Sequence, residues 1–364
     1  MQIFARTPEE WARELAPFGS RENILRAVRA AYRGEDLKAL PAFGARLAAE
    51  LRSRGLTGEL PAVLATSASE DGSEKLLLEL PSGNVESVLI PEVRREASRA
   101  HMREKTSTAR GERRPKPARA AGCISTQVGC AVGCGFCASG LLGLAKNLSV
   151  EEIVAQVLLL ERRAESRGYR LATLVFMGMG EPLHNTENLL RALEALTDRW
   201  GGGFGPATIT VSTVGVLAGI ERLAALGAKA PNLALSLHAP DDATRARIIP
   251  LQNLATAREA LEAARAFGRA TRRFVTVSYV LLQGVNDSLE QADELAGLLE
   301  GSGFHVNLIP WNAVSGLAFA PTPREQAQLF WSRLRARGIA CHFRKSRGAE
   351  RDAACGQLRR AQPA

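Results

Sequence analysis

The chain has no run of about twenty consecutive apolar residues, the length that a membrane-spanning helix needs. Its first residues, MQIFARTPEEW, contain two acids and lack the apolar stretch of a secretory signal peptide. Cysteine is scarce, with 6 residues in 364, which is too few for a disulfide framework in a chain of this length. We therefore expect a cytoplasmic protein without a membrane partner, and we expect its cysteines to be reduced.

Acidic residues are also outnumbered. The chain has 38 Asp and Glu against 47 Lys and Arg, a formal net charge of +9. This balance favours a polyanionic partner such as RNA or DNA, although charge alone does not distinguish them. Hydrophobic residues make up 46% of the chain, enough for a large core. We expect a globular enzyme with one large domain and smaller accessory parts.

Much of the positive charge lies in one segment, residues 94–120. It contains ten Lys or Arg and three Glu, a net charge of 10 − 3 = +7, and it has almost no large apolar side chains. Such a segment does not bury enough surface to fold alone. We expect it to be a disordered insertion or an arm that contacts RNA, with a solvated linker as the alternative.

Two small accessory parts precede this basic segment. Residues 1–58 contain apolar positions at helical spacing, within 22–32 and 43–55, and predict a helical N-terminal domain. Residues 59–93 contain three short apolar or alternating runs separated by turn residues. They predict a small β segment, whose last strand carries Glu86.

Residues 121–345 alternate between short apolar runs and amphipathic stretches, which predicts an α/β domain with a parallel sheet, closed or partly closed as a barrel. In such a domain the active-site groups lie at the carboxyl ends of the strands. Residues 346–364 form a C-terminal tail. The predicted strands are 171–178, 207–213, 232–238, 274–282, 305–310 and 340–345; the predicted helices are 150–163, 186–196, 216–226, 256–267, 289–299 and 324–337.

The strongest chemical signal is a group of three closely spaced cysteines, Cys130, Cys134 and Cys137. One loop of this spacing can wrap a small inorganic core, and three thiolates can hold three irons of a 4Fe-4S cluster. The fourth iron then stays open for a ligand such as S-adenosylmethionine (SAM). A structural zinc site is the alternative, but such sites usually pair two CxxC units or add histidines, and no histidine lies nearby.

A glycine-rich turn follows the first predicted strand of the domain. In Met177-Gly178-Met179-Gly180-Glu181 the glycines allow a ligand to approach the backbone closely, and the carboxylate can accept a hydrogen bond from an ammonium group. Alternatively, the turn only connects the strand to the following helix and binds no ligand. Because it lies one strand after the cysteine loop, we predict that Gly180 and Glu181 bind SAM.

Further polar residues lie at the ends of predicted strands. Ser212, Ser236, His238 and Asn312 converge on one rim if the strands form a barrel. We assign them, together with the intervening Leu237, to the same SAM pocket. Each one taken alone is better explained as a strand-end cap.

Together these segments resemble a known family, the radical SAM RNA methyltransferases that include RlmN and Cfr. The resemblance covers residues 20–92 and, more strongly, 121–358. It implies a partial (β/α)6 barrel of TIM type, a 4Fe-4S cluster and SAM as cofactors. The segments that carry it are GCISTQVGCAVGCGFCASG, KNLSVEEIVAQV, FMGMGEPLHN, TVSTVG, SLHAPDD, VNDS, VNLIPWN and RKSRG…DAACGQL.

The resemblance also implies roles for three residues outside the cluster loop. Cys355 matches the cysteine that first accepts a methyl group from SAM, before a deoxyadenosyl radical activates it for addition to adenine. Cys123 matches the second thiol, which releases the product by forming a transient disulfide with Cys355. Glu86 matches the carboxylate that takes the ring proton, or alternatively caps a strand edge. Cys341 lies in an apolar run and is expected to be a packed core residue.

The common reaction of this family methylates C2 of an adenine in 23S rRNA and often in tRNA, whereas a branch linked to antibiotic resistance methylates C8. The resemblance favours C2. It also implies an electron donor such as flavodoxin or ferredoxin, and we expect a monomer. Two other classes of protein are alternatives. A glycyl-radical activase shares the cluster but has no need of Cys123 and Cys355, and a noncatalytic RNA-binding protein explains only the charge.

Overall fold

A computed structural model describes residues 3–35, 43–56, 58–92, 117–141, 143–344 and 347–358. The basic segment predicted at 94–120 lies outside these ranges up to residue 116, as do residues 359–364 of the predicted tail. No helix within the described ranges has the length and apolar character needed to cross a membrane.

One sheet of ten strands organises the chain, in the order β1-β2-β3-β4-β7-β8-β9-β10-β11-β12. Strands β1 to β4 pair antiparallel, and from β4 onward all pairs are parallel. The bounds are β1 Ala62–Ala68, β2 Glu74–Glu79, β3 Val85–Pro91, β4 Ala118–Cys123, β7 Tyr169–Phe176, β8 Ile209–Thr213, β9 Asn232–Ser236, β10 Val275–Leu281, β11 His305–Pro310 and β12 Ala340–Phe343. A separate hairpin pairs β5 Gln127–Gly129 with β6 Leu144–Asn147.

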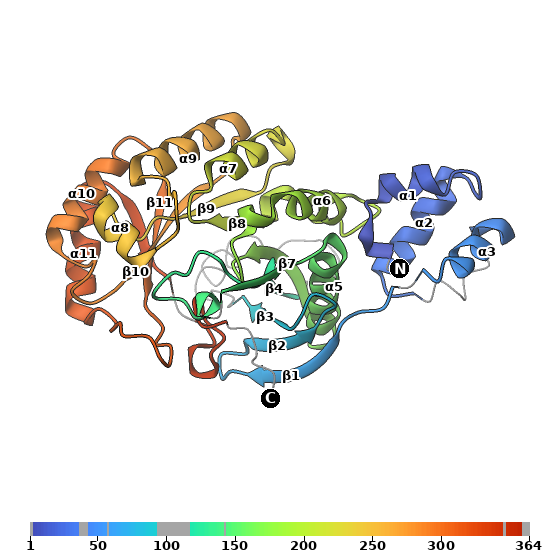
Figure 1. Cartoon of the computed structure of the whole chain (residues 1–364), viewed down its shortest axis with the longest axis horizontal. Coiled ribbons are helices and arrows are strands. Elements are labelled where there is room, and N and C mark those ends of the chain that lie inside the picture. The colour runs from blue at the N-terminus through green and yellow to red at the C-terminus, as the bar shows by residue number, and fades with distance from the viewer. Residues whose placement is uncertain are drawn as a thin grey trace, which may run out of the picture.

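Helices connect the parallel strands and cover the outer face of the curved sheet (Figure 1). They are α5 Val150–Ser166, α6 Thr186–Thr197, α7 Leu217–Ala224, α9 Ala257–Thr271, α10 Leu289–Leu299 and α11 Arg324–Ala336. The short helix α8 Asp242–Ile248 lies instead beside the cysteine loop, where the Ile248 carbonyl oxygen accepts a hydrogen bond from the Gly135 N–H. Short 3-10 turns occur at η1 Ile3–Ala5, η4 Ala138–Gly140, η5 Pro182–Asn185, η6 Pro206–Thr208, η7 Gly227–Lys229 and η8 Ala349–Arg351. Because β12 and β1 are the two edges of the sheet, the barrel is partial, and the predicted α/β fold class is confirmed.

Several of these helices begin with reciprocal caps. At α5 the Ser149 hydroxyl accepts a hydrogen bond from the backbone N–H of Glu152, and the Glu152 carboxylate accepts one from the backbone of Ser149. The same arrangement starts α9 and α10. Such capping boxes satisfy backbone donors that a helix leaves free at its first turn, so the sequence itself fixes where these helices start.

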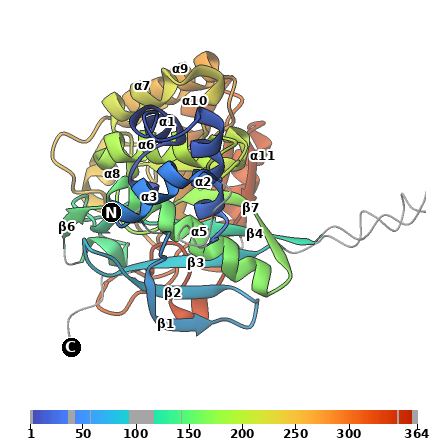
Figure 2. The same ribbon diagram turned by 90° about the vertical axis from the view of Figure 1, so that its right-hand side faces the viewer.

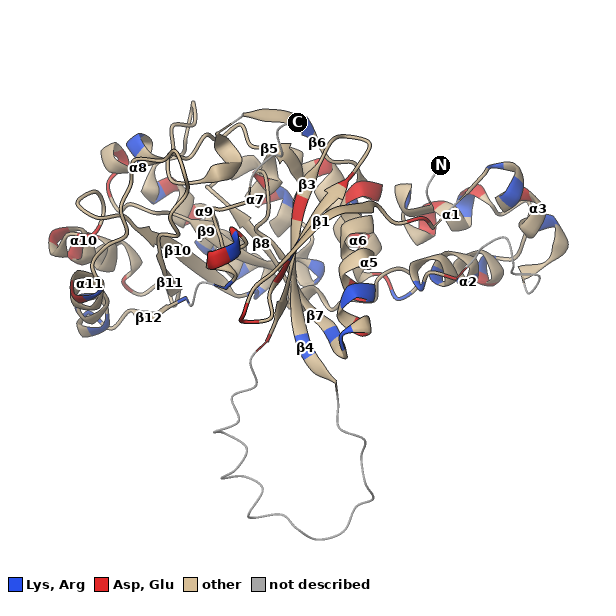
Figure 3. Cartoon of the chain, turned by 90° about the horizontal axis from the view of Figure 1, so that it is seen from below, with Lys and Arg blue, Asp and Glu red and all other residues tan. Residues whose placement is uncertain are grey.

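Three helices at the N-terminus pack together beside the sheet: α1 Pro8–Glu14, α2 Arg21–Tyr32 and α3 Ala45–Ser53. Figure 2 shows them in front of the crossover helices, with β1 to β3 together below. The side chain of Trp11 is fully buried and donates to the Ile3 carbonyl oxygen at 2.6 Å. An ion pair between Glu10 and Arg191 of α6, with N and O 2.9 Å apart, links these helices to the barrel. They carry basic and acidic residues in close alternation (Figure 3).

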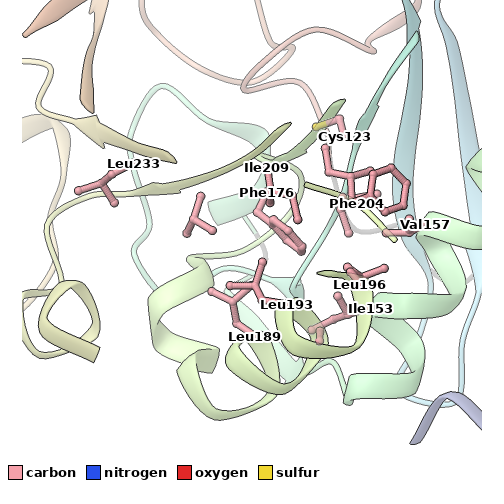
Figure 4. Packing of buried hydrophobic residues seen from close by; sticks show 14 of the residues in the cluster. Cys123, Ile153, Val157, Phe176, Leu189, Leu193, Leu196, Phe204, Ile209 and Leu233 are labelled. Carbon is pink, nitrogen blue, oxygen red and sulfur yellow. The ribbon is translucent and has the colours of Figure 1, made fainter. Parts of the chain in front are cut away.

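The main hydrophobic core lies between the sheet and the helices α5 and α6. Phe176 of β7, Leu193 of α6 and Val157 of α5 all belong to this cluster (Figure 4). A side-chain carbon added at Gly122 would lie 3.2 Å from Leu160, so Gly122 faces the helices and the next residue faces the opposite side of the strand. Cys123 therefore joins the core through its backbone and Cβ, while its sulfur points away from the packed side chains (Figure 4).

An almost buried carboxylate fastens the antiparallel strands to α5. Glu74 on β2 accepts two hydrogen bonds from Arg163, both 2.8 Å long, and its side chain is 5% exposed. These hydrogen bonds are the main reason why the pKa of Glu74 lies below its usual value. A carboxyl group with a lowered folded-state pKa stabilises the fold above its unfolded pKa, and this contribution disappears as the pH falls through the folded value.

We expect Glu74→Gln to lower the free energy of unfolding by about 1–3 kcal/mol near pH 7, because charge-assisted hydrogen bonds of a buried group are lost. Below about pH 4, where unfolded glutamate is protonated, the difference from wild type should shrink. Urea unfolding at several pH values measures it. Glu187→Gln is the control, since its ion pair with Arg222 is exposed and should matter little. An equal loss at pH 3 and pH 7 would contradict the assignment.

Candidate active site

A cavity at the carboxyl ends of the parallel strands brings together most of the residues that the sequence predicts for the site. Its wall also contains apolar side chains, among them Phe136, Phe176 and Trp311. Of the predicted residues, Cys123, Glu86 and Leu237 do not line it. Those that do are Cys130, Cys134, Cys137, Gly180, Glu181, Ser212, Ser236, His238, Asn312 and Cys355.

The three cysteines lie on the loop between β5 and β6. The thiol of Cys130 receives hydrogen bonds from the backbone N–H groups of Val132 and Gly133, and the thiol of Cys137 from Ser139. N–H groups aimed at sulfur stabilise thiolates and are one of the means by which a protein tunes an iron–sulfur cluster. The loop backbone is thus already arranged around its sulfurs.

Burial keeps these thiols protonated in the absence of iron. It is the main cause that raises the pKa of Cys130 to about 12 and that of Cys134 well above its usual range, and neighbouring Cys137 and Glu181 add to the effect. A bound cation reverses this preference, since it deprotonates a coordinating thiol outright. Within the described residues no three Cys, His or acidic side chains converge on a point that could hold a single metal ion. In a 4Fe-4S cluster each cysteine binds a different iron, so the spread of these thiols fits a cluster better than one zinc ion.

The glycine turn after β7 holds a carboxylate beside the cysteine loop. Gly180 has φ +100°, and an added Cβ would lie 2.5 Å from Gln127, so only glycine fits. The carboxylate of Glu181 accepts hydrogen bonds from the backbone N–H groups of Leu183 and Val214, both 3.0 Å long. Burial nevertheless raises its pKa to about 7. A carboxylate held this way, in a buried wall, favours a cationic group as its partner.

Small hydroxyl side chains line the inner face of three neighbouring strands. The hydroxyls of Ser212 on β8 and Ser236 on β9 are 3.1 Å apart, and Ser278 on β10 pairs in register with Ser236. Ser278 also lines the cavity, and no motif in the sequence marks it. Leu237 is fully buried in the hydrophobic core, and its backbone N–H donates to the Ser278 carbonyl oxygen. Its side chain therefore supports the strand rather than facing the cavity.

His238 is held as a neutral ring. Its backbone is in the left-handed region, at φ +63°, and its Nδ1 accepts a hydrogen bond of 3.0 Å from the Val280 N–H. Its ring meets Phe136 edge to face. Burial, and then the charge of Arg245, lowers the pKa of His238 to about 3. A neutral imidazole in this wall can take part in hydrogen bonding without adding charge.

The C-terminal tail lies between the cysteine loop and strands β1 and β2 (Figure 1), and its residues Cys355 and Gly356 line the cavity. Asn312 donates from Nδ2 to the Cys355 carbonyl oxygen at 3.0 Å. The backbone of Ala138, next to the last cluster cysteine, donates to the Gly356 carbonyl oxygen at 2.7 Å. The buried Gln357 adds a hydrogen bond to Ala313. These contacts hold the half-buried Cys355 thiol at the cavity wall.

Cys123 is the last residue of β4 and lies close to Cys355. Burial raises the pKa of its thiol to about 12, the Cys355 thiol raises it further, and the guanidinium of Arg344 lowers it. The two thiols are therefore close enough to influence each other, and both are free. Arg344 lines the cavity and donates to the Met177 sulfur. Arg344 belongs to the RKSRG segment, whose sequence does not by itself indicate a position beside the thiols.

Glu86 lies on the same face of the sheet as Cys123, because its neighbour Val88 two positions along β3 pairs in register with Cys123. Its carboxylate forms an ion pair with Lys75 of β2, with N and O 2.8 Å apart. Its carbonyl oxygen accepts from the hydroxyl of Ser125 at 2.6 Å. The side chain is thus buried on the Cys123 face of the sheet and does not line the cavity.

The partial barrel, the cysteine loop and the cavity at the carboxyl ends of the strands define a radical SAM protein, and the radical SAM superfamily matches residues 124–296. The chain is 40% identical to a dual-specificity RNA methyltransferase RlmN of Sorangium cellulosum, over 97% of this chain and 94% of that protein. It is 44% identical to a probable dual-specificity RNA methyltransferase RlmN of Opitutus terrae, over 82% and 79% of the two chains. The chain belongs to the RlmN family of radical SAM RNA methyltransferases.

A solved structure agrees with this assignment across nearly the whole chain. It is a radical SAM methyltransferase from Sphaerobacter thermophilus, 38% identical, with a TM-score of 0.84 and coverage of 98% of this chain and 99% of that one. The predicted cofactors, a 4Fe-4S cluster and SAM, are therefore confirmed as those of the family. The three thiols, the Glu181 carboxylate and the serine hydroxyls supply donors suited to both.

Proposed function

We propose that the protein methylates C2 of an adenine in 23S rRNA and in tRNA, with Cys355 as the methyl carrier. The observation that carries the proposal is a pair of thiols, Cys355 and Cys123, that meet beside the cavity and do not belong to the cluster set. Binding a cluster and SAM needs neither of them. The name dual-specificity RNA methyltransferase, which relatives bear, supports the choice of substrates.

Bound in this cavity, the cluster and SAM supply the methyl group and the one-electron chemistry that activates it. The residues of the chain do the rest. Cys130, Cys134 and Cys137 hold the cluster, and Glu181 accepts a hydrogen bond from the ammonium group of SAM. Cys355 accepts a methyl group on its sulfur by displacement, as a thiolate nucleophile. Asn312 holds the backbone of Cys355 so that this sulfur faces the cavity.

Glu86 and Cys123 act in the release of the methylated base. Once the methylene carbon on Cys355 has bonded to the adenine, Glu86 takes the proton that leaves the ring carbon, and the unpaired electron of the adduct returns to the one-electron carrier that started the reaction. The Cys123 thiolate then attacks the Cys355 sulfur, so that a disulfide forms and the sulfur–carbon bond breaks. The electron pair of the broken bond stays with the base, which is protonated to the methyl product. Arg344 favours the thiolate form of Cys123.

This sequence predicts that Cys123→Ala stops the reaction after the base has been bound. Incubated with SAM, reductant and tRNA or rRNA, the variant should accumulate a covalent protein–RNA adduct through Cys355 and should form less than about a hundredth of the wild-type product. Denaturing gel electrophoresis and mass spectrometry of the digested adduct measure it. Cys341→Ala is the matched control, since Cys341 lies on β12 with its thiol hydrogen-bonded to Trp331. Normal turnover by Cys123→Ala, with no adduct, would remove Cys123 from the mechanism.

The partners follow from the same proposal. The cluster needs an electron donor, for which a flavodoxin or a ferredoxin has suitable chemistry, and one chain holds every residue named above, which suits a monomer. We expect the reaction to occur in the cytoplasm. Methylation of C8 remains the second candidate, because the same pair of thiols serves either carbon; the position of the new methyl group in the product nucleoside separates the two.

A further inference from the structure

A second concave surface lies at the amino ends of the barrel strands, opposite the cavity. It is a groove between the end of α9, the start of β10 and the turn that precedes β11. Because the strands are parallel, these segments are at the end of the barrel remote from the cysteine loop. The groove is lined by Arg265, Gly268, Arg269, Arg273, Phe274, Val275, Gly301, Ser302, Gly303 and Phe304.

The groove is strongly basic. Arg265 and Arg269 lie one turn apart on α9, and Arg273 follows the end of that helix at the left-handed Arg272; all three line the groove. No carboxylate lines the groove, although Glu300 directly precedes its Gly301. Positive charge in the groove is thus not neutralised from within it.

Two of these arginines are held in place by the backbone around them. Arg273 donates from Nε to the Ala230 carbonyl oxygen at 2.7 Å. Arg265 donates to the Leu298 carbonyl oxygen and lies 5.9 Å from the centre of the Phe304 ring. Each keeps further N–H donors beyond these bonds. Guanidinium groups fixed in this way lose little conformational freedom on binding an anion.

An aromatic ring stands exposed among these charges. The side chain of Phe274 is 70% exposed, the largest exposed fraction among the big apolar side chains of the described residues. Its backbone is fixed, because its carbonyl oxygen accepts from Leu233 and its N–H donates to Asn232. The ring is therefore presented to solvent by a rigid strand end. Exposed aromatic rings beside arginines are the usual platform for unstacked bases of single-stranded RNA.

We propose that this groove is a second RNA-binding site, in which a base of a single-stranded segment stacks on Phe274 and the flanking phosphates pair with Arg265, Arg269 and Arg273. An acidic peptide would use the charges but not the exposed ring, so RNA accounts for both features. The inference rests on the proposed function, in that it takes RNA as the substrate. It adds a contact outside the catalytic cavity, which anchors a large RNA while its target adenine occupies the other end of the barrel.

Equilibrium binding of a 23S rRNA fragment to the full chain, titrated at several salt concentrations, tests this site. Phe274→Ala should weaken binding about tenfold, the loss of one stacked base, and should leave the salt dependence unchanged. Arg269→Ala should also weaken binding and should reduce the slope of log Kd against log salt by about one phosphate contact. Both side chains are exposed, so the variants should unfold at the wild-type temperature. At saturating RNA both should methylate with wild-type kcat.

Arg335→Ala is the matched control, because Arg335 is an exposed arginine in the last turn of α11 and does not line the groove. It should bind RNA like wild type. If Phe274→Ala and Arg269→Ala also bind RNA with the wild-type Kd, the groove is not an RNA site, and an acidic protein partner would give this same result. If wild type binds RNA through the groove but methylates none, the proposed function fails and the binding site stands.

Discussion

The Cys355→Ala variant is expected to transfer no methyl group to RNA, a loss of at least about 1,000-fold in product formation. The reason is chemical: an aromatic ring carbon that bears hydrogen is a poor nucleophile towards SAM, so the methyl group has to pass through a thiolate that can be alkylated. Cys355 is the half-buried thiol on the cavity wall. Alanine removes that sulfur and leaves the hydrogen bond from Asn312, which goes to the backbone, intact.

Product nucleosides and the mass of the peptide that contains Cys355 are the two readouts. Wild-type protein incubated with SAM should gain one methyl group on this peptide, and the variant should gain none. The variant should keep its iron content and its affinity for RNA, and Cys341→Ala should behave like wild type in all four measurements. Methylated adenosine at the wild-type rate from Cys355→Ala would show that the methyl group travels by another route.

Cys134→Ala should abolish both SAM cleavage and RNA methylation by removing a ligand of the cluster. Cys134 lies between the other two ligands in the loop, and its thiol is influenced by the charges of both. With two thiols left, the loop no longer holds three irons. We expect protein that is colourless after anaerobic reconstitution, with iron near zero where the wild type binds about four atoms per chain.

The same preparation should still fold and bind RNA, because the cysteine loop lies outside the main hydrophobic core. Unfolding temperature and RNA affinity check this, and Cys341→Ala serves again as the control that loses a cysteine without losing iron. A brown Cys134→Ala protein with full iron content would show that the cluster is held elsewhere.

The larger part of the fold could be predicted from the sequence. Six strands and six helices of the barrel were predicted, and the structure has them as β7 to β12 and as α5, α6, α7, α9, α10 and α11. Their signal is strong because each strand is apolar and each helix is amphipathic. The strand β4, Ala118–Cys123, was not predicted: alanine and glycine give it no strand pattern, and its first residues continue the basic segment. The helix α8, Asp242–Ile248, is too short to show a helical period.

Some residues of the candidate site could also be predicted from the sequence, and others could not. Residues inside compact motifs, such as the three loop cysteines and Glu181, could be predicted, because their chemistry needs a fixed local spacing. Ser278 and Arg344 could not, since they reach the cavity only through the register of the sheet. Leu237 was predicted because it lies between two cavity residues. Successive side chains at the end of a strand point to opposite faces, so the Leu237 side chain points into the hydrophobic core. The roles of Glu86 and Cys123 remain proposals.

The central claim is most directly tested by the identity of the methylated nucleoside. Anaerobically reconstituted protein, reductant and SAM with a deuterated methyl group would be incubated with 23S rRNA or tRNA, and the digested nucleosides examined by mass spectrometry. The proposal predicts labelled 2-methyladenosine, which is absent with Cys355→Ala. Labelled 8-methyladenosine would move the reaction to the other ring carbon. Protein that holds its cluster and cleaves SAM, yet leaves every adenosine unmethylated, would contradict the account.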